Sequence, residues 1–140
     1  MSFREKFAWL MVAVLVATGI QYAVTVYQVS EANGAIAPPA TLLLALWVML
    51  VVAASMLAYG VAGLVSRKEW QVPVDEREWL VRQRAGALSG TVLGIAILAA
   101  LGTFILCPDG NMLFHLVIGG LLVSQIAKFA LQIFYIRRGL

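Results

Sequence analysis

This sequence contains few of the residue types that hold metals, cofactors and reactive groups. Cys107 and His115 are the single cysteine and the single histidine among 140 residues. One cysteine excludes an internal disulfide and a redox pair, and one histidine excludes paired haem ligands from the same chain. A tetrahedral zinc site needs more ligands than these two residues supply. We therefore expect neither a metal nor a cofactor.

Charge is also scarce, because Asp, Glu, Lys and Arg together make up 12% of the chain while 62% of it is hydrophobic. Four long apolar stretches contain no Asp or Glu, and they cover residues 7–26, 41–65, 85–106 and 112–136. No acidic pair within these stretches, no nucleophile beside a base and no phosphate-binding glycine loop is visible. The sequence thus predicts a non-enzymatic protein.

Each apolar stretch is long enough to cross a lipid bilayer. A helix rises about 1.5 Å per residue, so about 20 residues span the hydrocarbon core of about 30 Å. Asn33-Gly34 and Pro38-Pro39 favour a chain reversal after the first stretch, and residues 107–111 form a tight turn by composition. We predict one all-α transmembrane domain over residues 1–140, with two hairpins of helices at about 7–26, 41–65, 75–106 and 112–136 and a loop at 66–74.

The first apolar stretch has a competing interpretation as a secretory signal, because Ala35-Ile36-Ala37 resembles a small-residue cleavage site. The apolar run is longer than the core of a signal peptide, and Pro38 would directly follow the cut. We therefore expect a retained transmembrane helix.

The basic residues predict an orientation. Nine of the ten Lys and Arg residues lie near the termini or in the central segment, and none lies in the connections at 28–40 and 107–111. Because short loops rich in Lys and Arg stay in the cytoplasm, we expect an inner-membrane protein with both termini and the central loop inside the cell. The basic residues gather at helix ends and form no separate face, so we expect anionic lipid headgroups and no nucleic acid as partners.

The central segment, residues 66–94, holds five of the basic residues and four of the seven acids. Pro73 delays helix formation, and Asp75 with Glu78 forms the acidic variant of a capping box, which predicts a helix start. The segment suits a cytoplasmic docking surface, and the alternative is that it only anchors the loop to anionic lipid. The residues of this predicted surface are Arg67, Lys68, Trp70, Asp75, Glu76, Arg77 and Glu78, with Arg82 and Arg84 at headgroup depth.

Gly86, Gly90 and Gly94 recur at every fourth position where the third stretch begins. Glycines at this spacing form a smooth groove that lets another transmembrane helix approach closely. The groove either packs inside the four-helix unit or joins the chain to a homo-oligomer or a larger complex.

Polar residues also recur at helical spacing within the first and fourth stretches, which is costly in lipid and marks a candidate site. Lys128 lies about 13 Å inside its helix end, and no apolar stretch contains an acid to pair with it. Either Lys128 snorkels to headgroups beside interhelical hydrogen bonds, or it belongs to a site for a substrate, ion or lipid. The predicted intramembrane site consists of Gln21, Thr25, Ser124, Gln125, Lys128 and Gln132.

His115 lies about one turn into the fourth stretch, away from Lys128. A lone histidine at this depth is more often a hydrogen-bonding residue near the interface than a ligand. A metal or a haem would need a second imidazole from a symmetric oligomer.

Two short motifs support a resemblance to a known family. Asp75 to Glu78 reads DERE directly before a helix, and Tyr135 to Gly139 reads YIRRG. In these motifs and in its whole plan, the chain resembles a family of small four-helix prokaryotic inner-membrane proteins of unknown function. The resemblance implies a multi-pass membrane protein and brings no catalytic residues.

Two functions fit these features. We favour a non-enzymatic interaction or accessory subunit that packs against membrane helices or docks a cytoplasmic partner, as a homo-oligomer or as part of a larger complex. The alternative is a small oligomeric transporter or channel for an anionic or neutral solute, lined by Gln21, Gln125 and Lys128. The chain resembles the small multidrug exporters in size, but it has Gln21 and no acid in the helix where they rely on a glutamate. Proton-coupled cation export is therefore disfavoured.

Overall fold

A computed structural model describes residues 3–65 and 76–138, and within these ranges the chain forms four long helices. They are α1 (Phe3–Asn33), α2 (Thr41–Val65), α4 (Glu76–Leu106) and α5 (Gly110–Arg138). Each helix contains a segment long and apolar enough to cross a membrane. The predicted all-α architecture with four membrane-spanning helices is therefore confirmed, and α2 has the predicted bounds.

Two helices extend beyond the apolar stretches that predicted them. α1 continues past residue 26 to Asn33 because no glycine or proline interrupts it, and it stops at Gly34, whose φ of 63° suits the residue after a helix. α5 begins at Gly110 because Asp109 caps its first turn. The Asp109 Oδ1 atom accepts hydrogen bonds from the backbone N–H groups of Asn111 at 2.8 Å and Met112 at 3.2 Å.

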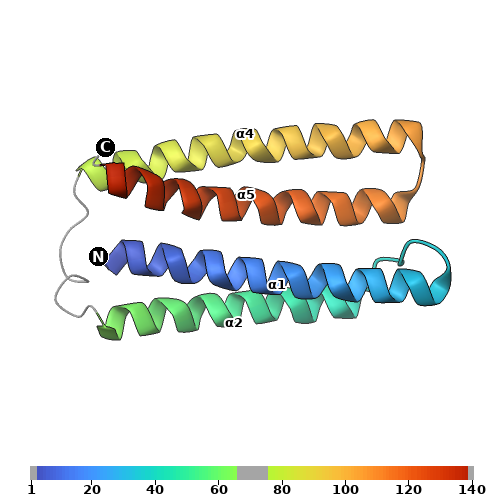
Figure 1. The fold of residues 1–140 in the computed structure, drawn as a ribbon, viewed down its shortest axis with the longest axis horizontal. Coiled ribbons are helices and arrows are strands. Elements are labelled where there is room, and N and C mark those ends of the chain that lie inside the picture. The colour runs from blue at the N-terminus through green and yellow to red at the C-terminus, as the bar shows by residue number, and fades with distance from the viewer. Residues whose placement is uncertain (1–2, 66–75, 139–140) are drawn as a thin grey trace.

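The helices lie side by side in an open row with the order α2, α1, α5, α4 (Figure 1). The main contacts join α4 to α5, α1 to α5 and α1 to α2. α2 and α4 are therefore the edges of the row, and α1 and α5 form the joint between the two hairpins. We call the end that holds both termini the terminal end, and the end that holds the connections at 34–40 and 107–109 the turn end.

Small residues bring α4 and α5 together. A Cβ atom built on Gly120 would lie 2.9 Å from the Ala96 Cβ atom, so the two backbones approach closely at this point. Ser124, one turn further along α5, is only 2% exposed, and Ala85 and Ala100 of α4 are equally inaccessible. Close backbone approach of this kind drives helix association in lipid, where apolar side chains gain little by leaving the solvent.

Aromatic rings hold α1 against α2. The Tyr22 and Trp47 ring centroids are 5.4 Å apart, and those of Phe7 and Tyr59 are 5.5 Å apart in an edge-to-face contact. The Trp47 indole N–H also donates a hydrogen bond to the Thr18 carbonyl oxygen at 2.9 Å. The α1 and α2 backbones lie close together over less of their length than the α4 and α5 backbones do.

The joint between the hairpins combines apolar contact with one ion pair. Leu122 of α5 packs over Gly19 of α1, within 3.5 Å of the position that a Cβ atom would take. At the terminal end, Arg137 Nε donates to Glu5 Oε1 at 2.9 Å, and the Glu5 side chain is 9% exposed. The pair fastens the start of α1 to the end of α5.

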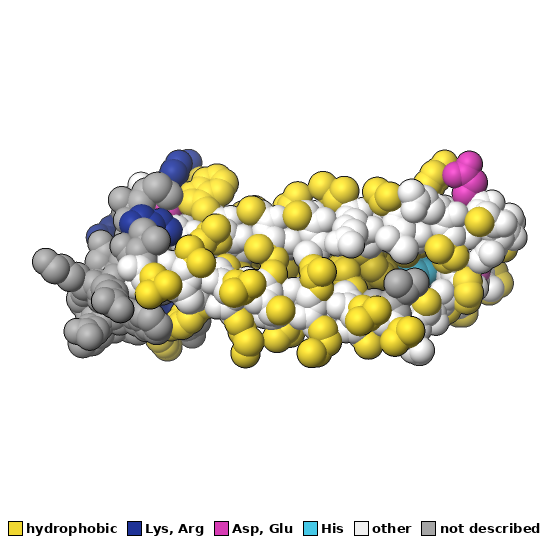
Figure 2. Space-filling model, turned by 90° about the horizontal axis from the view of Figure 1, so that it is seen from below, with side chains coloured by type: hydrophobic (Ala, Val, Ile, Leu, Met, Phe, Trp, Pro, Cys, Tyr) yellow, Lys and Arg dark blue, Asp and Glu magenta, His cyan; other side chains and the backbone are white. Residues whose placement is uncertain are grey.

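The surface of the row is apolar along its length, with basic side chains gathered at the terminal end (Figure 2). Large hydrophobic side chains with high exposure include Leu42 and Met56 on α2 and Leu98 and Ile105 on α4. Such a surface suits contact with lipid chains, because hydrocarbon solvates it without cost.

Candidate functional site

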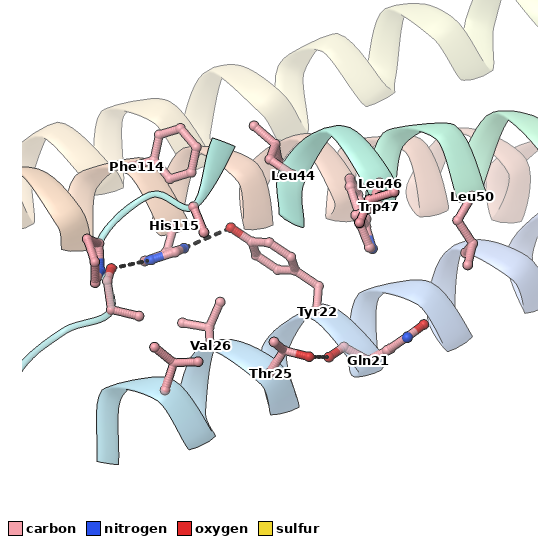
Figure 3. A pocket seen from close by; sticks show the side chains of 14 residues that line it. Gln21, Tyr22, Thr25, Val26, Leu44, Leu46, Trp47, Leu50, Phe114 and His115 are labelled. Atoms are coloured by element: carbon pink, nitrogen blue, oxygen red, sulfur yellow. Dashed lines mark hydrogen bonds between the residues drawn. The ribbon is translucent and has the colours of Figure 1, made fainter. Parts of the chain in front are cut away.

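A cavity of about 260 Å³ lies at the turn end, between α1, α2, the 34–40 connection and the first turns of α5 (Figure 3). Most of its wall is hydrocarbon, with a few hydrogen-bonding side chains among the apolar ones. The polar residues are Gln21, Tyr22, Thr25 and His115, and the larger apolar residues are Val26, Val29, Leu44, Leu46, Trp47, Leu50 and Phe114.

The cavity exists because the connection between α1 and α2 is held away from the helix axes. Gly34 turns the chain out of α1, and Pro38-Pro39 prevents the helix from resuming at once. Two hydrogen bonds then fix this segment, one from the Ala37 N–H to Ser30 Oγ at 2.9 Å and one from Asn111 Nδ2 to the Ile36 carbonyl at 3.3 Å. The connection therefore forms a fixed part of the cavity wall.

His115 joins three parts of the chain at the cavity wall. Its Nε2 atom lies 2.8 Å from the Ala37 carbonyl oxygen, and its Nδ1 atom lies 2.8 Å from the Tyr22 hydroxyl (Figure 3). A carbonyl oxygen only accepts, so Nε2 carries the hydrogen, and Nδ1 of the neutral ring accepts from Tyr22. The hydrogen-bonding role expected of His115 is confirmed, and its partners are α1 and the 34–40 connection.

Thr25 and Gln21 form the polar edge of the cavity. Thr25 Oγ1 donates to the Gln21 carbonyl oxygen at 2.9 Å, one helical turn earlier in α1. The Gln21 side chain is exposed, and its amide makes no hydrogen bond within the described parts of the chain. Both residues of α1 that the sequence assigned to a polar site therefore lie at this cavity.

The α5 residues of the predicted intramembrane site lie elsewhere. Ser124 is buried on the α4 side of its helix, Gln125 is exposed, and Lys128 and Gln132 are half-buried. None of these four lines the cavity. Their sequence spacing predicted one polar row, and the four residues differ in burial because α5 packs against both α4 and α1.

Lys128 has an aromatic neighbour within the described ranges. Its Nζ atom lies 5.9 Å from the Phe129 ring centroid, within the range of a cation–π contact. The acidic partner of the described ion pair, Glu5, belongs to Arg137 at the terminal end. Among the residues that the structure describes, the Lys128 ammonium therefore has no carboxylate partner.

Gly86, Gly90 and Gly94 lie on a part of α4 that no other described residue covers. A Cβ atom added at any of the three positions would meet nothing within 4 Å. The space beside Gly120, in contrast, is occupied by the Ala96 side chain. Within the described ranges, α4 and α5 associate through Gly120 and not through the row of three glycines.

The predicted cytoplasmic surface is only partly described. Arg67, Lys68, Trp70 and Asp75 lie outside the described residues, as does the side chain of Glu78 and with it the predicted capping box. The remaining residues are all exposed in the first turns of α4, at the terminal end, and they are Glu76, Arg77, Arg82 and Arg84.

Sequence reasoning did not identify Tyr22, Trp47 or Phe114 as cavity residues. A tryptophan in an apolar helix carries no signal for a cavity, because the same residue also suits a lipid-facing position. Comparison of the chain with protein-family models, with curated proteins and with solved structures finds no match.

Proposed function

We propose that this protein is a non-enzymatic membrane subunit that associates laterally with another transmembrane helix through α4. The observation that supports the proposal is the uncovered row of Gly86, Gly90 and Gly94 at an edge of the four-helix row. Glycines spaced by four residues favour close helix contacts in lipid. Covering the row requires a helix from outside the described fold.

A second copy of the chain is the simplest partner. A glycine groove is self-complementary under two-fold symmetry, since each helix offers the same smooth surface to the other. Lys128 is consistent with a partner, because an ammonium at this depth is stabilised by an acidic group, a carbonyl or a lipid phosphate brought to it. The resemblance to small four-helix inner-membrane proteins of unknown function remains a proposal and leaves the role open.

Energy transfer between copies tests this association. Cys107 is the one cysteine of the chain and is exposed, so donor and acceptor dyes attach there without new substitutions. In phosphatidylcholine vesicles we expect transfer above the level of random crowding, and Gly90→Leu should weaken association about tenfold or more. Gly60→Leu on α2 is the matched control, because a Cβ atom there also meets nothing within 4 Å. Equal transfer in both variants, or only random transfer in the unaltered protein, contradicts the proposal.

We also propose that both termini face the cytoplasm, as the distribution of basic residues predicts. The turn end then faces outward, and it carries Cys107. A membrane-impermeant maleimide should therefore label Cys107 in intact cells, and Cys107→Ser should abolish the signal. Labelling that requires permeabilised cells would reverse the orientation.

The solute pathway remains the alternative function, with weaker support. It needs Gln21, Gln125 and Lys128 along one route, whereas the cavity is lined by Gln21 and by neither of the α5 residues. Solute flux from the purified protein in liposomes, lost in Lys128→Ala, would favour this alternative over the interaction role.

A further inference from the structure

The cavity at the turn end has the size of a small ligand. Its volume of about 260 Å³ lies just below the usual range for small-molecule pockets, about 300–1,000 Å³. At about 30 Å³ for each water-sized group, the cavity holds roughly nine such groups. That is the size of a short hydrocarbon chain with one polar head group.

The wall of the cavity favours an uncharged ligand. The described residues that line it include no Lys, Arg, Asp or Glu. A charge placed in such surroundings loses its hydration and gains no ionic partner, which is unfavourable by several kcal/mol or more. Leu44, Leu46 and Leu50 of α2 and Phe114 of α5 present hydrocarbon instead.

The two hydroxyls in the wall favour a ligand that donates a hydrogen bond, and the Gln21 amide at the edge can either donate or accept. His115 is fully used, since Nε2 donates to Ala37 and Nδ1 accepts from Tyr22. The Tyr22 and Thr25 hydroxyls donate their hydrogens to His115 and to the Gln21 carbonyl. Each hydroxyl oxygen then has only lone pairs left to offer, so an incoming O–H group is the natural complement.

The cavity is open to the outside. Figure 2 shows the histidine side chain through a gap between apolar side chains at the turn end. Gln21 at the cavity edge is itself exposed. A ligand dissolved in the membrane can therefore reach the cavity from the side of the helix row.

We propose that this cavity binds an uncharged amphiphile with a hydroxyl head group, whose O–H donates to Thr25 Oγ1 while its chain lies against α2. The inference goes beyond the association role and does not depend on it, because the cavity lies between α1, α2 and α5 and the glycine row lies on α4.

Trp47 in the cavity wall provides the readout. The full chain with Trp47 as its only tryptophan (Trp9→Phe, Trp70→Phe, Trp79→Phe) is placed in phosphatidylcholine vesicles and titrated with 7-bromoheptan-1-ol. Bromine quenches indole fluorescence only at contact distance. We expect saturable quenching, with half-saturation at about tenfold lower concentration in the membrane than for 1-bromoheptane, which lacks the hydroxyl.

Two matched controls separate the cavity from the bulk membrane. A protein with Trp79 as its only tryptophan, which is 56% exposed on α4, reports quenching by probe dissolved in the lipid. Thr25→Val removes one acceptor from the cavity, and Thr91→Val removes a hydroxyl on α4 that bonds the carbonyl four residues earlier in the same way. Thr25→Val should lower the preference for the alcohol by about three- to tenfold, and Thr91→Val should leave it unchanged.

Three results would overturn the proposal. Linear quenching of Trp47 that matches that of Trp79 would show that the cavity binds nothing. Saturable quenching by both probes at equal concentrations would show an apolar crevice without selection of a hydroxyl. An equal effect of Thr25→Val and Thr91→Val would show that the Thr25 hydroxyl is not the group that selects the alcohol.

Discussion

The hairpin of α4 and α5 closes on small side chains, whereas the hairpin of α1 and α2 closes on large rings. Gly120 and Ala96 allow two backbones to meet, while Tyr22 and Trp47 hold two backbones apart. No residue of α4 lines the cavity of about 260 Å³, which lies beside α1 and α2 beneath the 34–40 connection. The comparison shows that helices of similar apolar composition can form either a close interface or a cavity large enough for a small ligand, depending on the size of the side chains between them.

The strongest test of this comparison enlarges Gly120. Gly120→Leu should lower the free energy of unfolding by at least about 3 kcal/mol, the upper end of the usual range for overpacking, because even a Cβ atom would lie 2.9 Å from that of Ala96. Unfolding in dilute detergent, followed by circular dichroism during titration with a denaturing detergent, measures the change.

Gly90→Leu is the control for that measurement. A Cβ atom at Gly90 meets nothing within 4 Å among the described residues, and replacing glycine within a helix gains up to about 1 kcal/mol. Its stability in dilute detergent should therefore stay the same or rise slightly. Equal losses in the two variants would mean that α4 and α5 do not close at Gly120.

The next largest effect should come from His115 of α5, which bonds to α1 and to the connection between α1 and α2. His115→Ala leaves the Tyr22 hydroxyl and the Ala37 carbonyl without their described partner, and each unsatisfied buried polar group costs about 1–3 kcal/mol. We expect a clear loss of thermal stability together with faster proteolysis of the 34–40 connection. Leu116→Ala, at the next position and 37% exposed, should lose much less. A His115→Ala protein as stable as Leu116→Ala would show that the connection is held by other contacts.

The smallest effect should come from the ion pair that joins the hairpins. Arg137→Gln removes the bond to Glu5, but the Arg137 side chain is 59% exposed, so solvent screens much of the attraction. We expect a loss of at most about 1 kcal/mol, reduced further by salt. Arg138→Gln tests the specificity, since the described contact of Arg138 is with the Phe134 ring of its own helix, 4.4 Å away. A loss of several kcal/mol in Arg137→Gln would show that the ion pair with Glu5 contributes more to stability than an exposed salt bridge does.

The sequence predicted the fold more completely than it predicted the residues of the cavity. Helix positions followed from long apolar runs, because a membrane span requires continuous hydrocarbon and internal backbone hydrogen bonding. The exceptions were helix ends: α1 continued to Asn33 through polar residues that are compatible with a helix, and Asp109 began α5 early. Of the predicted intramembrane site, Gln21 and Thr25 line the cavity, whereas Ser124, Gln125, Lys128 and Gln132 do not, and a site formed by all six residues stays a prediction.

The sequence by itself determined that this chain consists of long apolar helices, that nine of its ten basic residues lie near the termini or in the central segment and that α4 carries a glycine row. These are local properties, since hydropathy, charge and glycine spacing can be read along one helix at a time. Only the tertiary structure decided the order α2, α1, α5, α4, the contact of Gly120 with Ala96 and the meeting of Tyr22, Ala37 and His115. Apolar faces are chemically alike, so helix order depends on how side chains of different size fit together, and that fit is a property of pairs of helices.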